Sequence, residues 1–244
     1  MVFTEELMPG DSPRRFYGTA IWISESRLIT AGHVVTGTRG AILRVRVSLP
    51  GVSHVDPGHL AKKQIHSIEC TPIKNFYKRN RAIQDPPNPR DIAILDAGSY
   101  KAPSGRYLSS IAGSIIPPPK STIDVVGYPG YIKPDWIDAH EGLNDSNKGQ
   151  RDAESLLPRG HLTVTRGVAH ESIGSVFRYN ISTCPGMSGG CVLFNGKVIG
   201  EHSFHLSDLR SSSRASRQKA YQPANGALIY GRNRRDCERL YRAG

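Results

Sequence analysis

The chain has 244 residues, enough to bury a large core without disulfides or metals, and its net charge of +11 favours acidic binding partners. Its apolar runs are shorter than the ~18 residues of a membrane span, and acidic Glu5 and Glu6 stand where a secretory signal would be basic and then apolar. We therefore expect a cytoplasmic, monomeric protein without membrane contact, or a secreted one if a leader has been removed. The 25 glycines and 17 prolines predict a turn-rich globular fold.

Short β-strands are predicted for the first 110 residues. An alternating pattern at 16–23, a turn at 24–27 and an apolar run at 28–31 predict a hairpin. Residues 44–49 (RVRVSL) alternate between polar and apolar, so this strand is expected to have one apolar face and one solvated face. Residues 92–95 have the composition of a buried strand. We assign residues 1–15 to an N-terminal arm and residues 16–110 to the first half of the fold.

The second half, residues 121–230, also has the pattern of short strands. Asn195-Gly196 suits the two-residue turn of a tight hairpin between strands at 191–194 and 197–202. Further strands are expected at 123–126, 161–165 and 176–183. A linker at 111–120 contains three consecutive prolines, and helices are expected at 152–157 and at the C-terminus, residues 231–244. The sequence therefore predicts an all-β protein in two halves.

The chain contains four cysteines: Cys70, Cys184, Cys191 and Cys237. They include no C-x-x-C pair and have no companion histidine at zinc-finger spacing, so we expect no structural metal. Nothing in the sequence implies a cofactor. Because the chain shows no secretion signal, we expect the thiols to be reduced rather than paired in disulfides.

Three segments contain residue types that can carry chemistry: TAGHV at 30–34, DIAIL at 91–95 and GMSGG at 186–190. Each has an ordinary structural interpretation when taken alone, since a histidine can end a strand, an aspartate can begin one and a serine among glycines is common in loops. Together they supply His33, Asp91 and Ser188. A hydroxyl nucleophile needs a general base within hydrogen-bond reach, and that base needs a carboxylate to fix its tautomer.

In this order, with strands between them, the three motifs resemble those of the chymotrypsin-like serine peptidases over residues 17–230. The resemblance implies two packed antiparallel six-stranded β-barrels, the first with His33 and Asp91 and the second with Ser188. It assigns Ser188 as nucleophile, His33 as general base and Asp91 as the residue that orients it. The N–H groups of Gly186 and Ser188 would form the oxyanion hole. Asp96 is the rival to Asp91, but it follows the apolar run, whereas the family pattern places its aspartate before it.

Other residues distinguish this chain from trypsin. Met187 stands where trypsin-type zymogens have the aspartate that pairs with a newly cleaved N-terminus, so activation by that salt bridge is excluded. Residues 127–130 (GYPG) and 198–202 (VIGEH) instead resemble the glutamyl endopeptidase branch. Ser182 stands where trypsin has the aspartate that attracts Lys or Arg.

The resemblance also implies that Thr183 and His202 bind an acidic side chain of a peptide or protein substrate, with Ser182 and Ser203 in the same pocket. The alternative is an apolar pocket with Ser182 at its floor.

A different class of function is a catalytically silent binding module of the same fold. Basic residues between 74 and 81 alternate with Phe76 and Tyr77, and the C-terminal segment contains further arginines. We favour the interpretation of these residues as a solvated surface and do not expect nucleic acid as a partner. A silent module would have no need of all three triad residues, so we expect an enzyme.

Overall fold

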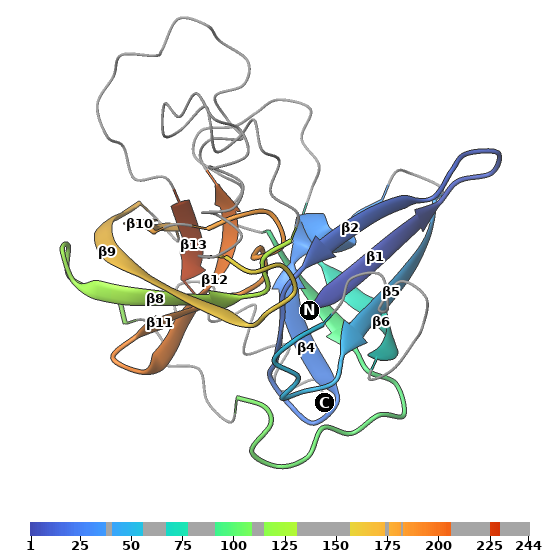
Figure 1. The fold of residues 1–244 in the computed structure, drawn as a ribbon, viewed down its shortest axis with the longest axis horizontal. Coiled ribbons are helices and arrows are strands. Elements are labelled where there is room, and N and C mark those ends of the chain that lie inside the picture. The colour runs from blue at the N-terminus through green and yellow to red at the C-terminus, as the bar shows by residue number, and fades with distance from the viewer. Residues whose placement is uncertain are drawn as a thin grey trace, which may run out of the picture.

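The computed structural model describes residues 1–37, 41–55, 67–77, 91–108, 115–130, 157–173, 176–181, 183–205 and 225–229. Within these ranges, two curled antiparallel sheets account for nearly all regular structure, with one short 3-10 helix (Figure 1). The predicted all-β class is confirmed. The expected C-terminal helix at 231–244, nearly all of the expected helix at 152–157, and residues 111–114 of the linker lie outside the described residues.

Seven strands form the first sheet, in the order β2-β1-β5-β6-β7-β4-β3. Their bounds are β1 Val2–Leu7, β2 Arg14–Gly18, β3 Ala20–Trp22, β4 Arg27–Ala31, β5 Ile42–Ser48, β6 Ser67–Asn75 and β7 Ile92–Asp96. The two edge strands, β2 and β3, are separated in the chain by Thr19 alone, so the sheet curls until its edges meet at this residue. If β2 and β3 are counted as one bent strand, the first sheet has the predicted six strands.

The N-terminal segment differs from the prediction. Strand β1 lies between β2 and β5 inside the first sheet, and Val2 and Phe3 are fully buried. Residues 2–7 are therefore a strand of the sheet and not an arm. Charged residues in this segment hide the alternation that is typical of a strand. One of them, Glu5, lies opposite Arg15 on the neighbouring strand β2, and the Arg15 Nε is 3.5 Å from the Glu5 carboxylate.

Strand β5 also corrects a prediction in part, because two of the three residues on its polar face are covered rather than solvated. Arg46 and Ser48 are buried together with their apolar neighbours, whereas Arg44 is exposed as predicted. The Arg46 guanidinium lies over the Phe3 ring, 5.9 Å from its centroid, and its Nε is 3.7 Å from the Glu69 carboxylate. Ser48 accepts a 2.8 Å hydrogen bond from the Met1 amino group. Strand β1 provides this cover, and its position could not be expected from the β5 sequence.

The second sheet is a closed six-stranded barrel with the strand order β10-β13-β12-β11-β8-β9. Its strands are β8 Thr122–Gly127, β9 Thr163–Ile173, β10 Val176–Asn180, β11 Cys191–Phe194, β12 Lys197–His205 and β13 Asn225–Ile229. The hairpin of β11 and β12 turns at Asn195 and Gly196, with φ of 50° and 72° as a type I′ turn requires. This predicted hairpin is confirmed.

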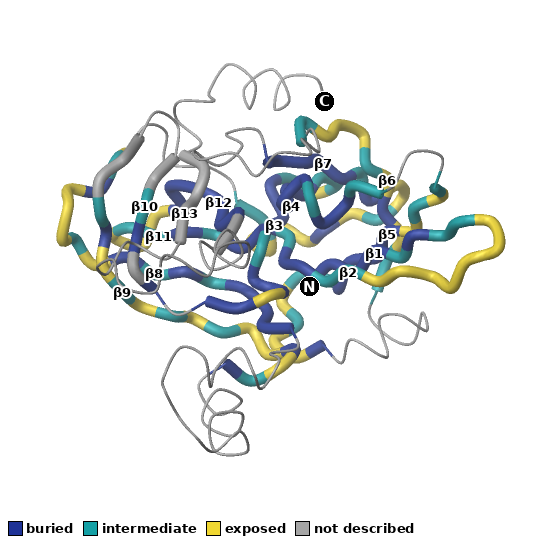
Figure 2. The backbone as a smooth tube through the Cα atoms, turned by 90° about the horizontal axis from the view of Figure 1, so that it is seen from above, coloured by how far each residue is buried: buried dark blue, intermediate teal, exposed yellow. Residues whose placement is uncertain are grey.

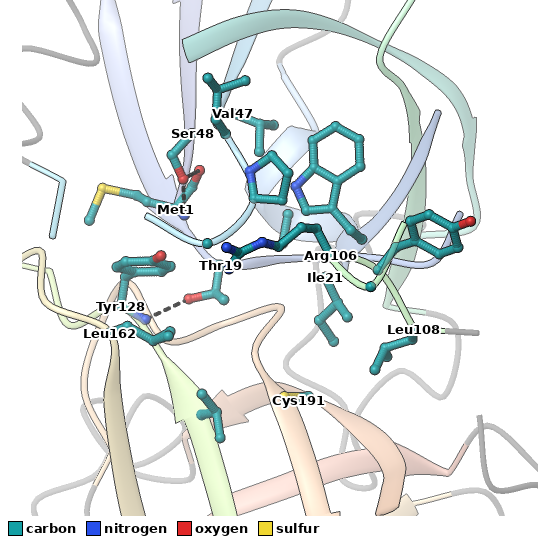
Figure 3. Close-up of a pocket in the computed structure, with 18 residues that line it drawn as sticks. Met1, Thr19, Ile21, Val47, Ser48, Arg106, Leu108, Tyr128, Leu162 and Cys191 are labelled. Carbon is teal, nitrogen blue, oxygen red and sulfur yellow. Dashed lines mark hydrogen bonds between the residues drawn. The ribbon is translucent and has the colours of Figure 1, made fainter. Parts of the chain in front are cut away.

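The two sheets pack against each other through an apolar cluster that we call the seam. Its members are Ile23, Ile29, Ile92, Ile94 and Val198, with partly buried Cys191 and Leu193 against them. Figure 2 shows the buried strands β4 and β7 of the first sheet on the side facing the second. Elsewhere between the sheets, a cavity of about 360 Å³ is lined by Trp22 of β3, Val126 of β8 and other residues (Figure 3).

The part of the chain that the structure describes contains no helix with the length and hydropathy of a membrane-spanning segment.

Candidate active site

His33 lies on a short 3-10 helix, η1 (Gly32–Val35), that follows buried strand β4 directly. Val34 and Val35 anchor this turn in the core of the first sheet, while the His33 side chain remains 37 % exposed. The Thr36 hydroxyl donates a 2.7 Å hydrogen bond to the Gly32 carbonyl and closes the turn. The His33 imidazole is therefore exposed to solvent on a turn whose neighbouring residues are tightly packed.

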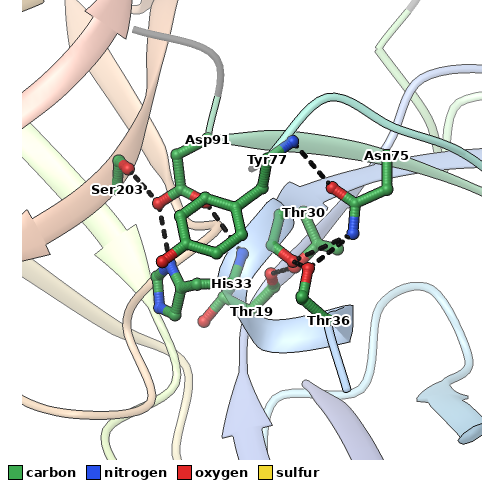
Figure 4. Close-up of polar contacts among 9 residues, drawn as sticks. Thr19, Thr30, His33, Thr36, Asn75, Tyr77, Asp91 and Ser203 are labelled. Carbon is green, nitrogen blue, oxygen red and sulfur yellow. Dashed lines mark hydrogen bonds and ion pairs between the residues drawn. The ribbon is translucent and has the colours of Figure 1, made fainter. Parts of the chain in front are cut away.

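Asp91 stands at the beginning of β7 and is 5 % exposed. Its Oδ1 accepts the backbone N–H of His33 at 2.8 Å, and its Oδ2 accepts Nδ1–H of the same residue at 2.7 Å (Figure 4). The Ser203 hydroxyl, from β12 of the second sheet, donates to Oδ2 at 2.5 Å. One buried carboxylate therefore binds residues of both sheets.

These contacts decide the charge of Asp91 and the tautomer of His33. Burial alone would raise the pKa of Asp91, but the attraction of His33 and the hydrogen bonds from His33 and Ser203 outweigh it, so the pKa lies below its ordinary value. An ionised carboxylate only accepts hydrogen bonds, so Nδ1 of His33 carries a proton and Nε2 of the neutral ring is the basic nitrogen.

Asp96, the alternative acid, lies at the other end of β7. Its Oδ1 accepts the backbone N–H of Gly98 at 2.7 Å, which is a local turn contact. Asp96 is five positions after Asp91, or roughly 17 Å along the strand. Asp91 is therefore the carboxylate that the structure brings to His33.

The loop of Ser188 is held against the first sheet by its backbone. Its carbonyl accepts a 2.7 Å hydrogen bond from the Thr19 N–H, and the Thr19 hydroxyl donates to the Gly186 carbonyl at 2.9 Å. A Cβ placed on Gly18 would lie 2.8 Å from the methyl groups of Val34 and 3.0 Å from the Ser188 carbonyl oxygen. The loop of residues 186–190 carries the predicted nucleophile Ser188, and we call it the nucleophile loop. It is therefore packed beside the helix that carries His33.

Glycines shape this loop. Gly186 and Gly189 have φ of +99° and +88°, and a Cβ on Gly189 would be 2.0 Å from the Thr19 carbonyl oxygen. The N–H groups of Met187, Gly189 and Gly190 donate to backbone carbonyls. Within the described residues, those of Gly186 and Ser188 have no backbone acceptor. The loop thus leaves two donors of the kind that an oxyanion hole needs.

The Met187 side chain belongs to the apolar core and not to the polar site. Its side chain is fully buried in the core of the second barrel, among Ile123, Val192 and other apolar residues. The position that carries an aspartate in trypsin-type zymogens is therefore part of an apolar core here.

The predicted specificity residues lie on both sides of this loop. Thr183 and His202 are buried, and Nδ1 of His202 is 2.5 Å from the Tyr179 hydroxyl. The side chain of Ser203 has a different position from the one predicted, because its hydroxyl is directed to Asp91 rather than into a substrate pocket. Ser182 lies outside the described residues.

A cleft of about 520 Å³ opens beside His33 on the side of the first sheet. It is lined by residues of β1 and β2 and of the segments after η1 and β6: Glu6, Arg14, Arg15, Phe16, Thr36 and Tyr77. The His33 imidazole is therefore open to this cleft.

Comparison with known proteins agrees with this geometry. The trypsin-like peptidase domain matches residues 18–200, three quarters of the chain. The chain belongs to this family.

Solved structures similar to this trypsin-like domain include the active form of the Rv3671c protease from M. tuberculosis, with a TM-score of 0.55, 18 % identity and coverage of 97 % of this chain and 78 % of that one. Another is the inactivated protease paralogue S-I1 of the scabies mite, with a TM-score of 0.57, 12 % identity and coverage of 100 % and 94 %. At such identities the likeness establishes the fold. The comparison with curated proteins finds no match.

Two residues that sequence reasoning missed organise the trypsin-like site. Thr19 joins the edges of the first sheet and, besides its bonds to the nucleophile loop, accepts the Tyr128 N–H at 2.8 Å. Asn75, at the end of β6, donates to the Gly32 carbonyl at 3.2 Å and to the Thr36 hydroxyl at 2.7 Å. These two hydrogen bonds stabilise η1. Neither residue has a local sequence signal, because each acts on segments distant in the chain.

The described cysteines of the trypsin-like domain, Cys70, Cys184 and Cys191, are free thiols, and Cys237 lies outside the described residues. Burial raises the pKa of Cys70 and Cys184 to about 12 and that of Cys191 to about 11. These thiols are therefore protonated and behave as small apolar side chains. Over the same part of the chain, no three His, Cys, Asp or Glu side chains are grouped as metal ligands would be.

Proposed function

We propose that the chain is a serine endopeptidase in which Ser188, His33 and Asp91 form the catalytic triad. The observation that carries this proposal is the buried Asp91 carboxylate, which accepts Nδ1–H of His33 at 2.7 Å and so leaves Nε2 as the base. That base would take the Ser188 proton as Oγ bonds to the peptide carbonyl carbon. It would return the proton to the leaving amine as the C–N bond breaks, and water would then release the acyl group by the same route.

Stabilisation of the tetrahedral intermediate would come from the N–H groups of Gly186 and Ser188. Both belong to a loop whose other N–H groups donate to backbone carbonyls. Donors fixed in advance need no reorganisation when negative charge develops on the oxygen, and losing one such donor costs on the order of 10²–10³ in rate.

For substrate preference we propose Glu or Asp immediately before the cleaved bond. Burial raises the pKa of Tyr179 well above its ordinary value, so its hydroxyl stays protonated and can donate to Nδ1 of His202. His202 would then present Nε2–H to a substrate carboxylate, with the Thr183 hydroxyl as a second donor. The alternative is an apolar pocket in which His202 is only a buried strand residue.

The test uses a fluorophosphonate probe and a peptide library. Covalent labelling of the wild type that is absent in Ser188→Ala supports the serine peptidase, provided both proteins have the same thermal midpoint. A library varied at the residue before the cleaved bond should then give Glu and Asp as preferred residues. A preference for Phe, Leu or Arg would overturn the proposed specificity for acidic residues but would not contradict the serine peptidase.

A catalytically silent binding module is the second candidate. What favours it is that one structural neighbour, the scabies mite paralogue, is described as an inactivated protease. A folded wild-type sample that neither reacts with the probe nor cleaves any library peptide would support this candidate and overturn the first.

A further inference from the structure

Glu201 is a buried carboxyl at the seam that the proposed mechanism does not use. It lies on β12 two residues before Ser203, and its exposed fraction is 0 %. Its partner across the ladder to β11 is Cys191, which packs against the seam cluster. Residues opposite each other on paired strands share a face. Glu201 therefore lies on the face of the second sheet that Cys191 turns to the seam, on the same strand as Ser203, which binds Asp91.

The two carboxyls differ in their hydrogen bonds. Asp91 accepts three, from the backbone and Nδ1 of His33 and from the Ser203 hydroxyl. Among the described residues, neither carboxyl oxygen of Glu201 has a hydrogen-bond partner. Two neighbouring carboxylates in a dry interior cannot both ionise cheaply, and hydrogen-bond donors decide which one carries the charge. The geometry gives the charge to Asp91 and the proton to Glu201.

The surroundings of Glu201 agree with this assignment. Burial first, and then repulsion by Asp91, raise the pKa of Glu201 well above its ordinary value, while the Gly189 N–H, already donating to the His202 carbonyl, offsets them in part. The titratable groups that face it are the Cys191 thiol, the Tyr179 hydroxyl and Asp91 with its bound His33. The first two are neutral, and His33 is hydrogen-bonded to Asp91.

We propose that Glu201 is a positioning residue, held as a neutral carboxylic acid at the seam so that Asp91 alone presents negative charge to His33. Its effect on catalysis rests on the proposed function, whereas its protonation state does not. When Glu201 loses its proton as the pH rises, a second anion stands beside Asp91. The seam is then weakened and the bonds from Ser203 and His33 to Asp91 are disturbed.

The protonation state can be measured without any peptidase activity. In Ser188→Ala protein at pH 7, the infrared C=O stretch of a protonated carboxylic acid should be present and should disappear in S188A/E201Q. The control is Glu25→Gln, since Glu25 is exposed and paired with Lys101 at the surface, and this change should leave the band in place. A spectrum without the band at pH 7 would overturn the proposal.

Stability gives a second readout. A group whose pKa is raised by folding stabilises fully below its unfolded pKa, about 4.3 for Glu, and loses this contribution as pH rises toward its folded pKa. The unfolding constant of wild type relative to E201Q should therefore rise by up to ~10-fold per pH unit above that value. A ratio that does not depend on pH would contradict a protonated Glu201. If E201Q does not fold, the infrared titration of the wild-type chain alone decides.

Activity is the third readout. The amide of E201Q imitates the neutral acid and cannot ionise, so the kcat/KM of E201Q relative to wild type should rise as the pH rises and wild-type Glu201 loses its proton. If the kcat/KM of E201Q and the kcat/KM of wild type depend on pH in the same way, Glu201 has a structural role alone. If the chain has no peptidase activity, this arm gives no signal and the proposed function fails, while the infrared and stability results still decide the state of Glu201.

Discussion

The first sheet holds His33 and Asp91 by hydrogen bonds of side chains, whereas the second holds the nucleophile loop by hydrogen bonds of its backbone. In the first, the Asp91 carboxylate and the Asn75 amide fix η1. In the second, the N–H groups of Gly189 and Gly190 are bonded to carbonyls of β12 and of the loop itself. The position of His33 is therefore sensitive to the chemistry of particular side chains, and that of Ser188 to the conformation of the chain.

The seam joins these two kinds of support. Ser203 of the second sheet donates to Asp91 of the first, and Thr19 of the first bonds the loop of the second. Neither half has a complete site, so substitutions in either half should affect catalysis. In the first half the loss of a side-chain hydrogen bond should matter most, and in the second half a change of backbone conformation. The following experiments test this contrast.

The largest effect is expected from Ser188→Ala in the second half. Removal of a triad nucleophile lowers the rate of peptide hydrolysis on the order of 10⁴–10⁶-fold. The fold should remain, because the hydroxyl fills little space and the loop is held by its backbone. Steady-state kinetics and the thermal midpoint check both statements, and residual activity within tenfold of wild type would contradict the assignment.

Asp91→Asn in the first half should lower kcat by about 10⁴, because the amide favours the wrong tautomer of His33. Asp96→Asn is the matched control on the same strand, where the carboxylate bonds a turn N–H, and it should change kcat little. If Asp96→Asn proves the more damaging change, Asp91 is not the orienting acid.

The dependence of the nucleophile loop on its backbone is tested by Gly189→Ala. Both Gly189 and Gly10 have positive φ, of +88° and +82°, which costs an alanine roughly 1–2 kcal/mol at either site. At Gly189 the new methyl would also meet the Thr19 carbonyl oxygen, whereas nothing lies within 4 Å at Gly10. Gly189→Ala should therefore destabilise the protein more than Gly10→Ala and abolish hydrolysis. Equal unfolding free energies would refute the close packing of this loop.

His202→Ala should remove selectivity rather than catalysis. Loss of a hydrogen bond to a charged group costs about 1.5–3 kcal/mol, so the preference for Glu over Gln before the cleaved bond should fall by roughly 10–150-fold. The ratio of kcat/KM for matched Glu and Gln peptides measures it. An unchanged ratio would exclude His202 as the residue that binds the acid.

The smallest effect concerns the cores of the two halves, where Cys70 and Cys184 are buried as free thiols. A reductant should leave the thermal midpoint unchanged. A disulfide would contribute about 2–5 kcal/mol, so a drop of many degrees on reduction would disprove the prediction of free thiols.

The sequence by itself determined the all-β class, the hairpin at Asn195 and the pairing of His33 with Asp91. These depend on short-range rules: alternation gives strands, Asn-Gly gives a tight turn, and a motif keeps its residues on one short segment. The same rules failed for β1 and Arg46, because a charged side chain counts as exposed until its partner on another strand is known.

The tertiary structure alone decided the bonds that cross between distant segments. Only folding brings Ser203 to Asp91, 112 residues apart in the chain, and Thr19 to Gly186, 167 residues apart. It also decided the environment of Glu201, which in sequence is an ordinary acidic residue of a strand. Hydrogen bonding and desolvation depend on what lies across the seam, and no local pattern of residues encodes that.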